Sequence, residues 1–523
     1  MDSFRLQNIK SFKDTGTIEL KPITILVGRN SCGKSSLLRF PAVMAQTACT
    51  PGNDPPVSLF GNITDYGNFN DIIYKKEGKQ ITFSLEYLID INPDNYIYID
   101  SFGHLDISRV ANPDFKSIMA HAKLSVTLEQ YLVNREFVRQ VDLEVDNQLL
   151  SSLKWNDADR KYHLKLTPFS YGDRNFGDRV IEFTYEKSEI NFYKFFPEYE
   201  RDINSFLNAY GLEETPENRK EMERTFWFQM SLHRGSGIRK DAEKNPVIRQ
   251  IQNGAELFDF STDIMERVKK QFVSEGKLHI SYIGPFRKAP ERIYRYSGAT
   301  IDHVGAKGEN ISDMLISFRR GHRNIYTSIS RWVEKNMGYK IDMMPIGNNY
   351  YQMTLVESDR TRTNIMDVGF GISQVLPIVS EVFMMGYKDA EDTDIPELER
   401  NLILIEQPEL HLHPAAQASL AELFATCVTT NPHNQLIIET HSEHLINKLQ
   451  VLIADENEAL TNEMVQILYV DKKDGQTIIG KMNIKENGRF ETAWPVGFFD
   501  QGYELARELL RKSSVQKGST QNE

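Results

Sequence analysis

The sequence is poor in cysteine and has no long hydrophobic run. Its 523 residues include three cysteines, Cys32, Cys49 and Cys427, whose spacings fit neither a disulfide framework nor a zinc site. No stretch reaches the ~20 apolar residues that cross a bilayer, and residues 1–5 lack the hydrophobic core of a signal sequence. We therefore expect a soluble protein of the reducing cytoplasm that does not contact a membrane.

An excess of basic residues is also absent. Lysine and arginine number 61 against 73 aspartates and glutamates, which gives a formal net charge of −12. Contact with DNA or RNA therefore requires a local basic patch, because no overall positive field attracts nucleic acid. Solvated salt-bridge faces are the simpler interpretation of the basic clusters that the chain contains. Two such groups stand out: Arg287, Lys288, Arg292 and Arg295, and then Arg319, Arg320, His322 and Arg323.

Neither an internal repeat nor a sustained heptad is present, so no long coiled-coil arm is expected. Two or three lobes are expected from the length and the 40% hydrophobic content. Apolar residues alternate with a period of two over 79–185, which predicts an antiparallel β subdomain, and helix-like runs over 186–280 predict a helical insertion. The flanking segments 1–78 and 281–511 are assigned to the two parts of one α/β domain, and the polar residues 512–523 to a disordered tail.

What the sequence does contain is a phosphate-binding loop. Residues 28–35 read G-x-x-x-x-G-K-S, directly after the apolar run 23–27 and before a helical run. The glycines let backbone N–H groups face an anion, and Lys34 and Ser35 are placed for the terminal phosphates and Mg²⁺. We therefore predict ATP and Mg²⁺ as ligands. The predicted contacts are Gly28, Asn30, Ser31, Gly33, Lys34, Ser35 and Ser36.

Two later segments are predicted to complete the nucleotide site, because each is an apolar run that ends in a polar residue. The apolar run 402–405 ends at Glu406, which predicts a buried parallel strand whose carboxylate helps Ser35 to hold Mg²⁺. A second apolar run, 435–438, is followed by Glu439 and two residues later by His441. This context favours His441 as a site residue at the same sheet edge, although a lone histidine is more simply a capped or solvated one.

A third segment lies between these halves. Gly369 and Gly371 precede an amphipathic run that contains Ser373, and together they offer backbone N–H groups and a helix N-terminus suited to a phosphate. Taken alone, a G-x-G sequence is usually just a turn.

In this order, the four segments resemble the ABC-type ATPase head of the group that contains RecF, the chromosome-maintenance ATPases and the overcoming-lysogenization-defect nucleases. Three stretches, 283–287, 406–414 and 494–500, are similar to the PtuA ATPases of Septu anti-phage defence, which also occur beside some retrons. The resemblance implies an α/β fold: an ABC-type P-loop ATPase head with an antiparallel β subdomain and an inserted helical lobe.

The resemblance also implies how ATP and partners are bound. Such heads enclose ATP between two copies, with residues 28–36 of one copy opposed by residues 369–373 of the other, in a head-to-tail dimer or a higher oligomer. In Septu the partner is a small HNH nuclease, PtuB, and a retron context adds a reverse transcriptase and its RNA–DNA hybrid. Residues 451–523 show no nuclease site of the lysogenization-defect kind, so a partner would do the cutting.

One position departs from the pattern. Most ABC heads have a glutamate that activates the attacking water where this chain has Gln407, and a neutral amide cannot accept a proton at ordinary pH. Loss of a general base costs ~10²–10⁴ in rate, so we expect slow turnover by a catalytic set of Lys34, Glu406, Gln407 and His441. The alternatives are a DNA-repair or chromosome-associated ATPase that clamps DNA directly, and a scaffold with an inactive nucleotide site.

Overall fold

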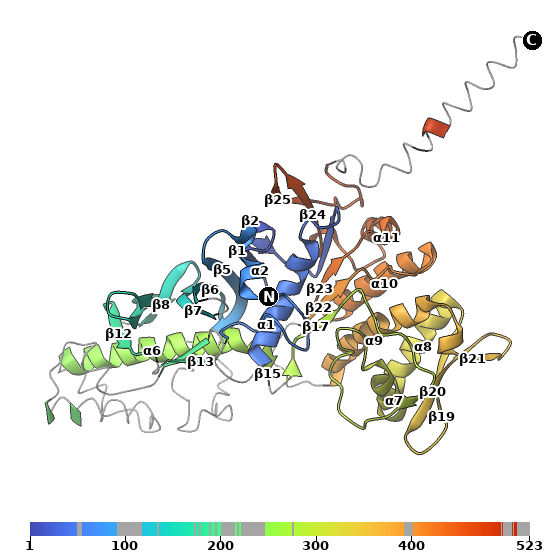
Figure 1. Ribbon diagram of the computed structural model, residues 1–523, viewed down its shortest axis with the longest axis horizontal. Coiled ribbons are helices and arrows are strands. Elements are labelled where there is room, and N and C mark those ends of the chain that lie inside the picture. Colours follow the sequence, from blue (N-terminus) through green and yellow to red (C-terminus); the bar gives the residue numbers. More distant parts are fainter. Residues whose placement is uncertain are drawn as a thin grey trace, which may run out of the picture. The chain divides into compact units, whose positions relative to one another are not determined.

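The protein is described from a computed structural model (Figure 1). Its chain divides into two compact units: the first consists of Met1–Glu19, Phe40–Ile280 and Pro396–Arg400, and the second of Leu20–Arg39, Ser281–Ile395 and Asn401–Glu523. The predicted tail 512–523 and most of the stretch 494–500 lie outside the described residues. The structure describes residues 1–49, 55–91, 118–132, 135–171, 174–176, 179–187, 190–193, 196–199, 215–216, 219–220, 246–274, 277–391, 401–492, 494, 505 and 507–509.

A nine-stranded antiparallel sheet forms the first unit, in the order β12-β9-β8-β7-β6-β5-β1-β2 with β3 also on β1. Strand β5 shows why it forms, since Ile81, Phe83, Leu85 and Tyr87 are buried while the residues between them are not. The predicted antiparallel sheet is therefore confirmed. The strands are β1 (Ser3–Ile9), β2 (Phe12–Asp14), β3 (Ile18–Glu19), β5 (Gln80–Ile91), β6 (Ile118–Leu132), β7 (Arg135–Val145), β8 (Gln148–Asn156), β9 (Lys161–Leu166) and β12 (Ile181–Tyr185).

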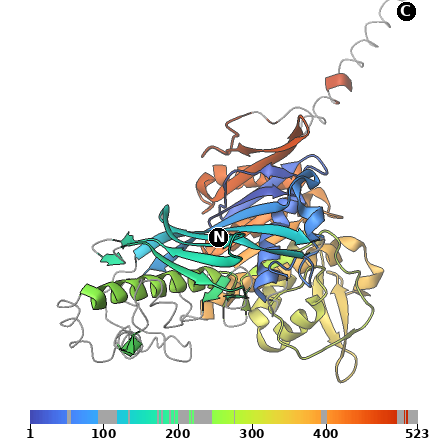
Figure 2. The same cartoon turned by 60° about the vertical axis from the view of Figure 1, so that its left-hand side comes forward.

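The long helix α6 (Pro246–Lys270) runs along this sheet and contacts β5, β6 and β9 (Figure 2). An aromatic pair joins the helix to the sheet, since Phe258 meets Phe183 of β12 edge-on at 5.7 Å between ring centroids. Phe260 stacks at 5.2 Å on Phe169, which lies outside this sheet in a separate two-stranded ribbon. The sheet thus packs against a helix that begins about 155 residues after the end of β5.

The segment predicted as a helical insertion differs in part from that prediction. It contains α6, but also the hairpins β13 (Ile190–Tyr193) with β14 (Phe196–Tyr199) and β15 (Val273–Ser274) with β16 (Lys277–Leu278). Aromatic residues and Pro197 at 190–199 favour strands over a helix. The helix-like run 217–232 lies largely outside the described residues. The first unit also has β10 (Phe169–Tyr171), β11 (Arg174–Phe176), α2 (Phe69–Ile72) and η1 (Tyr74–Lys76).

The second unit contains a six-stranded sheet in the order β17-β22-β23-β4-β24-β25. Strands β22, β23, β4 and β24 run parallel to one another, and β25 pairs antiparallel with β24 at the edge of the sheet. The run 402–405 is a fully buried parallel strand, as predicted. The bounds are β4 (Ile23–Gly28), β17 (Ile280–Ile283), β22 (Asn401–Glu406), β23 (Asn434–Glu439), β24 (Val465–Lys473) and β25 (Gln476–Met482).

Helices pack on this sheet around one hydrophobic core. Figure 1 shows α10 and α11 beside β22 and β23, and residues of α9, α10 and α11 share the core with Ile25, Ile403 and Ile438. A smaller sheet, β18-β20-β19 with β21 on β20, packs with α7 and α8. The elements are α1 (Lys34–Cys49), α7 (Ile311–Gly321), α8 (Arg323–Met337), α9 (Phe370–Glu391), α10 (Pro414–Thr430), α11 (Glu443–Ala454), β18 (Tyr294–Arg295), β19 (Lys340–Pro345), β20 (Tyr350–Val356), β21 (Arg362–Asn364), η4 (Ile365–Asp367) and η5 (Asn462–Met464).

No helix among the described residues is long and apolar enough to cross a membrane.

Candidate nucleotide-binding site

The loop between β4 and α1 has the backbone that a phosphate-binding loop needs. Gly28 has φ +142°, and a Cβ there would lie 1.9 Å from the carbonyl oxygen of Val470 on the neighbouring strand β24. Gly33 has φ +103° and Ser31 φ +61°. Glycine is thus required at position 28 by both conformation and space, which lets the loop turn directly off the strand.

Lys34 is folded inside this loop. Its side chain is 3% exposed, and its ammonium donates hydrogen bonds to the carbonyl oxygens of Gly28 at 3.1 Å and Arg29 at 2.9 Å. A buried cation that is held by the loop itself is already placed for an anion that binds there.

The hydroxyl of Ser35 donates to Glu439, at 2.6 Å from Oε2. Glu439 ends β23, is 4% exposed, and also lies 3.7 Å from the Lys34 ammonium. Burial raises the pKa of Glu439, and the charge of Glu406 raises it further, against the lowering by the Ser35 hydrogen bond. Sequence reasoning assigned Glu439 no role. Its position after a buried strand, as for Glu406, is the signal that could have found it.

Glu406 lies at the end of the next strand, but its carboxylate faces other partners. Arg39 donates Nε to Oε1 at 2.5 Å and Nη2 to Oε2 at 2.8 Å, and the Tyr282 hydroxyl donates to Oε1 at 2.8 Å. These hydrogen bonds raise the pKa of Arg39. Glu406 is therefore the acceptor of a bidentate ion pair. Its predicted metal-binding role stays a prediction.

Gln407 follows with an unusual backbone, at φ +45°. Its N–H donates to the Glu439 carbonyl at 2.8 Å, and Arg287 donates to the Glu406 carbonyl at 2.7 Å and the Gln407 carbonyl at 3.3 Å. Burial lowers the pKa of Arg287 to about 10. Arg287 belongs to the first basic group, yet it is 7% exposed and holds this turn from within.

Glu409 fixes the segment that carries His441. It accepts from the His441 N–H at 2.7 Å and from the Thr440 hydroxyl at 2.8 Å. The Nε2 atom of His441 is buried and has no hydrogen-bond partner among the described residues. Burial, with a smaller contribution from Lys34, lowers the pKa of His441. The imidazole of His441 is therefore neutral at ordinary pH, and its Nε2 atom could form a hydrogen bond with a bound ligand.

The segment 369–373 is not joined to the phosphate loop by any contact that the described residues show. Helix α9 begins at Phe370, and Ser373 donates its hydroxyl to the Phe370 carbonyl at 2.8 Å. A Cβ on Gly371 would lie 2.9 Å from the carbonyl oxygen of His411. The helix N-terminus thus packs against the loop after β22, and Phe370 remains 62% exposed.

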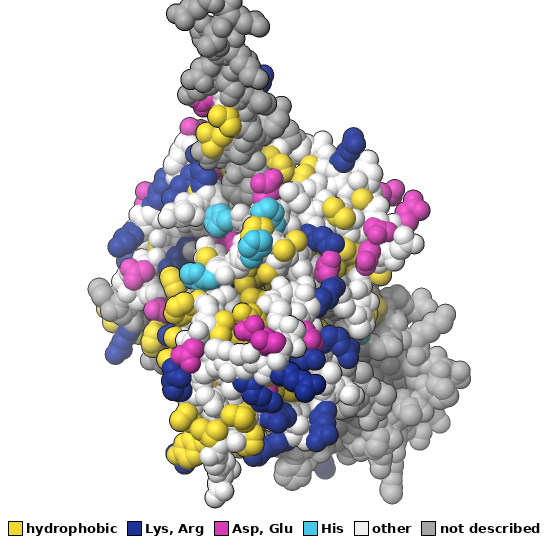
Figure 3. Space-filling model, turned by 90° about the vertical axis from the view of Figure 1, so that its right-hand side faces the viewer, with side chains coloured by type: hydrophobic (Ala, Val, Ile, Leu, Met, Phe, Trp, Pro, Cys, Tyr) yellow, Lys and Arg dark blue, Asp and Glu magenta, His cyan; other side chains and the backbone are white. Residues whose placement is uncertain are grey.

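Exposed histidines gather near these strand ends. His411 and His413 follow β22, and His444 lies in the first turn of α11. Figure 3 shows histidine side chains together with hydrophobic ones on one face. His413 caps α10, accepting from the Ala415 N–H at 3.4 Å, with Pro414 in the first turn. This capping role was not foreseen.

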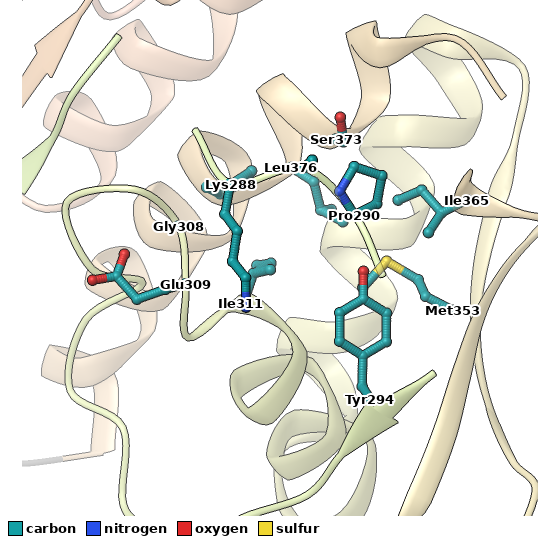
Figure 4. A pocket seen from close by; sticks show the side chains of 12 residues that line it. Lys288, Pro290, Tyr294, Gly308, Glu309, Ile311, Met353, Ile365, Ser373 and Leu376 are labelled. Carbon is teal, nitrogen blue, oxygen red and sulfur yellow. The ribbon is translucent and has the colours of Figure 1, made fainter. Parts of the chain in front are cut away.

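A small pocket lies beside Ser373 (Figure 4). Lys288, Tyr294, Gly308 and Glu309 line it together with Ser373. It occurs on the side of α9 that faces the loop 288–294, and its lining mixes apolar side chains with a few polar groups.

The remaining basic residues are largely paired. Arg292 forms two hydrogen bonds with Asp367, at 3.0 and 2.7 Å. Arg319 lies 3.2 Å from Asp342, and Arg320 stacks 4.5 Å above the Tyr296 ring. Lys288 pairs with Glu291 at 2.5 Å. These contacts agree with the simpler interpretation of salt-bridged faces, and phosphate contact by the two groups is the alternative that no contact here tests.

Comparison with known structures gives low similarity scores to heads of chromosome-maintenance (SMC) proteins. One is an SmcHead bound to the C-winged helix domain of ScpA, with 9% identity, TM-score 0.39, and coverage of 93% of this chain and 98% of that one. Another is an SMC head domain from Thermotoga maritima, with 8% identity, TM-score 0.36, and coverage of 92% and 99%. A third, an Smc head from Pyrococcus furiosus bound to the C-terminal domain of ScpA, has 10% identity, TM-score 0.36, and coverage of 98% and 99%.

Family comparison is more informative. No curated protein matches the chain. Residues 460–509 match a family described as a protein of unknown function (DUF3696). Residues 1–446, most of the 523-residue chain, match the AAA ATPase domain, and the loop geometry at Lys34 agrees with it. The chain belongs to the AAA ATPase domain family.

Proposed function

We propose that the protein is a slow ATPase, two copies of which enclose ATP and thereby control a separate nuclease in bacterial anti-phage defence. The observation that carries the nucleotide part is the buried Lys34 ammonium, held by the loop carbonyls, together with the unmet Nε2 atom of His441. A phosphate would satisfy both groups, because it accepts hydrogen bonds from a cation and from an imidazole N–H.

Backbone N–H groups of residues 28–36 and the Lys34 side chain would bind the phosphates. Oxygen donors for Mg²⁺ are present in Ser35 and Glu439, with Glu406 on the adjacent strand, so the residues fit a hard cation that prefers oxygen. Bound Mg²⁺ would neutralise phosphate charge. His441, whose backbone N–H donates to Glu409, would form a hydrogen bond with the terminal phosphate through its ring.

Slow turnover follows from Gln407. Its amide can orient water but cannot take a proton. The nearby carboxylate of Glu409 is engaged by the Thr440 hydroxyl and the His441 N–H, which makes it a poor substitute. ATP would then act mainly as a ligand that holds a closed assembly.

The dimer part of the proposal is supported by the exposed start of α9. The surface here is formed by Gly369, Phe370 and His411, which are all exposed. Among the described residues, the loop 28–36 of the same copy does not contact it. A second copy could bring its own loop 28–36 to this surface. The nuclease partner, an HNH protein of the PtuB kind with or without a retron reverse transcriptase and RNA–DNA, is supported only by the sequence resemblance of stretches 283–287, 406–414 and 494–500.

The test is to measure size in solution by light scattering with and without a nonhydrolysable ATP analogue and Mg²⁺. The wild type should shift from a smaller to a larger species, and Lys34→Ala should not shift. Lys485→Ala, an exposed lysine outside the site, is the control. An analogue that binds without any change in size would overturn the dimer part, and absence of binding would overturn the whole proposal. Copurification of an HNH protein encoded beside the gene would test the partner.

A further inference from the structure

We propose that Glu439, and not Glu406, is the carboxylate that coordinates the Mg²⁺ accompanying ATP. The proposal rests on the proposed binding of ATP at the Lys34 loop and specifies which side chains hold the metal there.

The order of strands places Glu439 nearer to the phosphate loop. Strand β23 lies directly beside β4, with Glu439 opposite Leu26, whereas β22 lies one strand further away, with Glu406 opposite Glu439. In parallel strands, the residues at the same register lie about one strand spacing, ~4.8 Å, apart. Glu439 is therefore the acidic residue on the strand that adjoins the loop.

The carboxylate of Glu406 is already hydrogen-bonded to Arg39 and Tyr282. Both of its carboxylate oxygens receive hydrogen bonds from Arg39, and one also receives the Tyr282 hydroxyl. The carboxylate is 2% exposed. Moving it out of this ion pair to reach a metal would break both hydrogen bonds with Arg39, whose side chain is 30% exposed, and would remove the acceptor of the Tyr282 hydroxyl.

Glu439 contacts the two side chains that serve the terminal phosphates in a loop of this kind. Its Oε2 atom lies 2.6 Å from the Ser35 hydroxyl, and its Oε1 atom lies 3.7 Å from the Lys34 ammonium. Neighbouring ligands of an octahedral Mg²⁺ at ~2.0–2.1 Å are about 2.9 Å apart. A change of a few tenths of an ångström would therefore let Ser35 and Glu439 occupy adjacent positions around one ion.

The backbone at Glu439 is fixed by hydrogen bonds on both sides. Its carbonyl accepts from the Gln407 N–H at 2.8 Å, and the following N–H, of Thr440, donates to the Leu26 carbonyl at 3.1 Å. The strand end is thus tied to both neighbouring strands, so the side chain is presented from a rigid position.

The experiment measures metal affinity, with Mn²⁺ as the probe, by electron paramagnetic resonance of the full-length protein with ATP bound. Glu439→Gln should weaken Mn²⁺ binding on the order of 10–100-fold, and Glu439→Asp should restore part of it. Glu406→Gln should change it only a few-fold. Glu443→Gln, an exposed acid in the first turn of α11, is the matched control. Affinity for ATP in EDTA, and the melting temperature, show whether each variant is folded.

Two results would overturn the assignment of the metal ligand: Mn²⁺ affinity unchanged in Glu439→Gln, or a large loss in Glu406→Gln while its ATP binding in EDTA is kept. A wild-type protein that binds no ATP with or without metal would instead overturn the proposed function. The two failures are thereby distinguished.

Discussion

At the residue scale, Gln407 sits where a backbone turn is held from two sides. Glu439 accepts its N–H, and Arg287 binds its carbonyl, so the residue keeps a positive φ that side chains seldom adopt. This places an amide at the position where the resemblance implies a general base.

Gln407→Glu should therefore increase ATP turnover, by ~10²-fold or more, because the general-base effect is worth ~10²–10⁴. The measurement is phosphate release under saturating ATP and Mg²⁺. Gln476→Glu, an exposed position in β25, is the control for added charge. A rate for Gln407→Glu that equals or falls below the wild-type rate would show that the missing base is not what limits turnover.

His441 allows a second prediction. Its folded pKa lies below its ordinary value because burial and Lys34 disfavour the imidazolium, so the unfolded chain binds a proton near pH 6.5 while the folded chain does not. Stability should fall as the pH is lowered from about 7.5 to about 5.5. His441→Asn should reduce this fall in melting temperature, and His444→Asn, which is exposed, should not. Equal pH dependence in all three proteins would contradict this account.

His441→Ala gives a further prediction at the same residue. We expect it to keep ATP binding, since Lys34 and the loop are intact, and to lose turnover or the ATP-dependent change in size. Fluorescent-nucleotide titration and light scattering measure the two properties separately. Loss of both together would show instead that the histidine is needed to bind the nucleotide.

The tight loop at residues 28–35 could be predicted from the sequence because the G-x-x-x-x-G-K-S pattern depends on local spacing. That these residues bind phosphate stays a prediction. The Ser35–Glu439 and Arg39–Glu406 contacts could not be predicted, since their partners are 404 and 367 residues apart. An acid at a strand end can be seen in a sequence, but which neighbour receives its carboxylate depends on the order of the strands.

At the scale of elements, the start of α9 offers two glycines that differ in their surroundings. A Cβ on Gly371 would lie 2.9 Å from the His411 carbonyl, whereas nothing lies within 4 Å of one on Gly369. Gly371→Ala should therefore destabilise the fold by about 1–3 kcal/mol, as an overpacked site does, and Gly369→Ala should have little effect. Melting temperatures decide this, and equal values for both variants would contradict it.

Elements were predictable where a pattern repeats along the chain. The alternation in β5 and the buried apolar run of β22 predict the correct element types. Segment 190–199 was assigned to a helical insertion and is a hairpin, because its aromatic residues and Pro197 outweigh a weak helical pattern.

At the scale of the whole molecule, the proposed dimer predicts complementation. Lys34→Ala removes the loop contact, and Phe370→Arg alters the exposed start of α9. Each variant alone should form no closed dimer with an ATP analogue. In an equal mixture, a mixed pair retains one site made of an intact loop and an intact surface, and random pairing leaves about a quarter of sites intact. Recovery of analogue-dependent association upon mixing checks this, and its absence would contradict a site shared between copies.

An ATPase domain of the α/β class was predictable, because the loop 28–35 and the later strand ends follow a recognisable order, and residues 1–446 match the AAA ATPase domain. The narrower resemblance to PtuA stays a proposal. The division of the chain was not predictable. The first unit takes Met1–Glu19 and the second takes Leu20–Arg39, a change within one short stretch that no composition shift marks. Predicted boundaries such as 1–78 stay predictions.

Strand β4 lies between β23 and β24, both of which are synthesised more than 400 residues later. During translation, a nascent chain that has already made the glycine-rich loop thus lacks both neighbours of the strand that carries it, and each edge of β4 stays open to mispairing. The sheet around this loop can be completed only after residue 470 has been synthesised, because Val470 is the partner of Gly28 in β4. Shorter translation products would contain the whole loop without the strands that flank it.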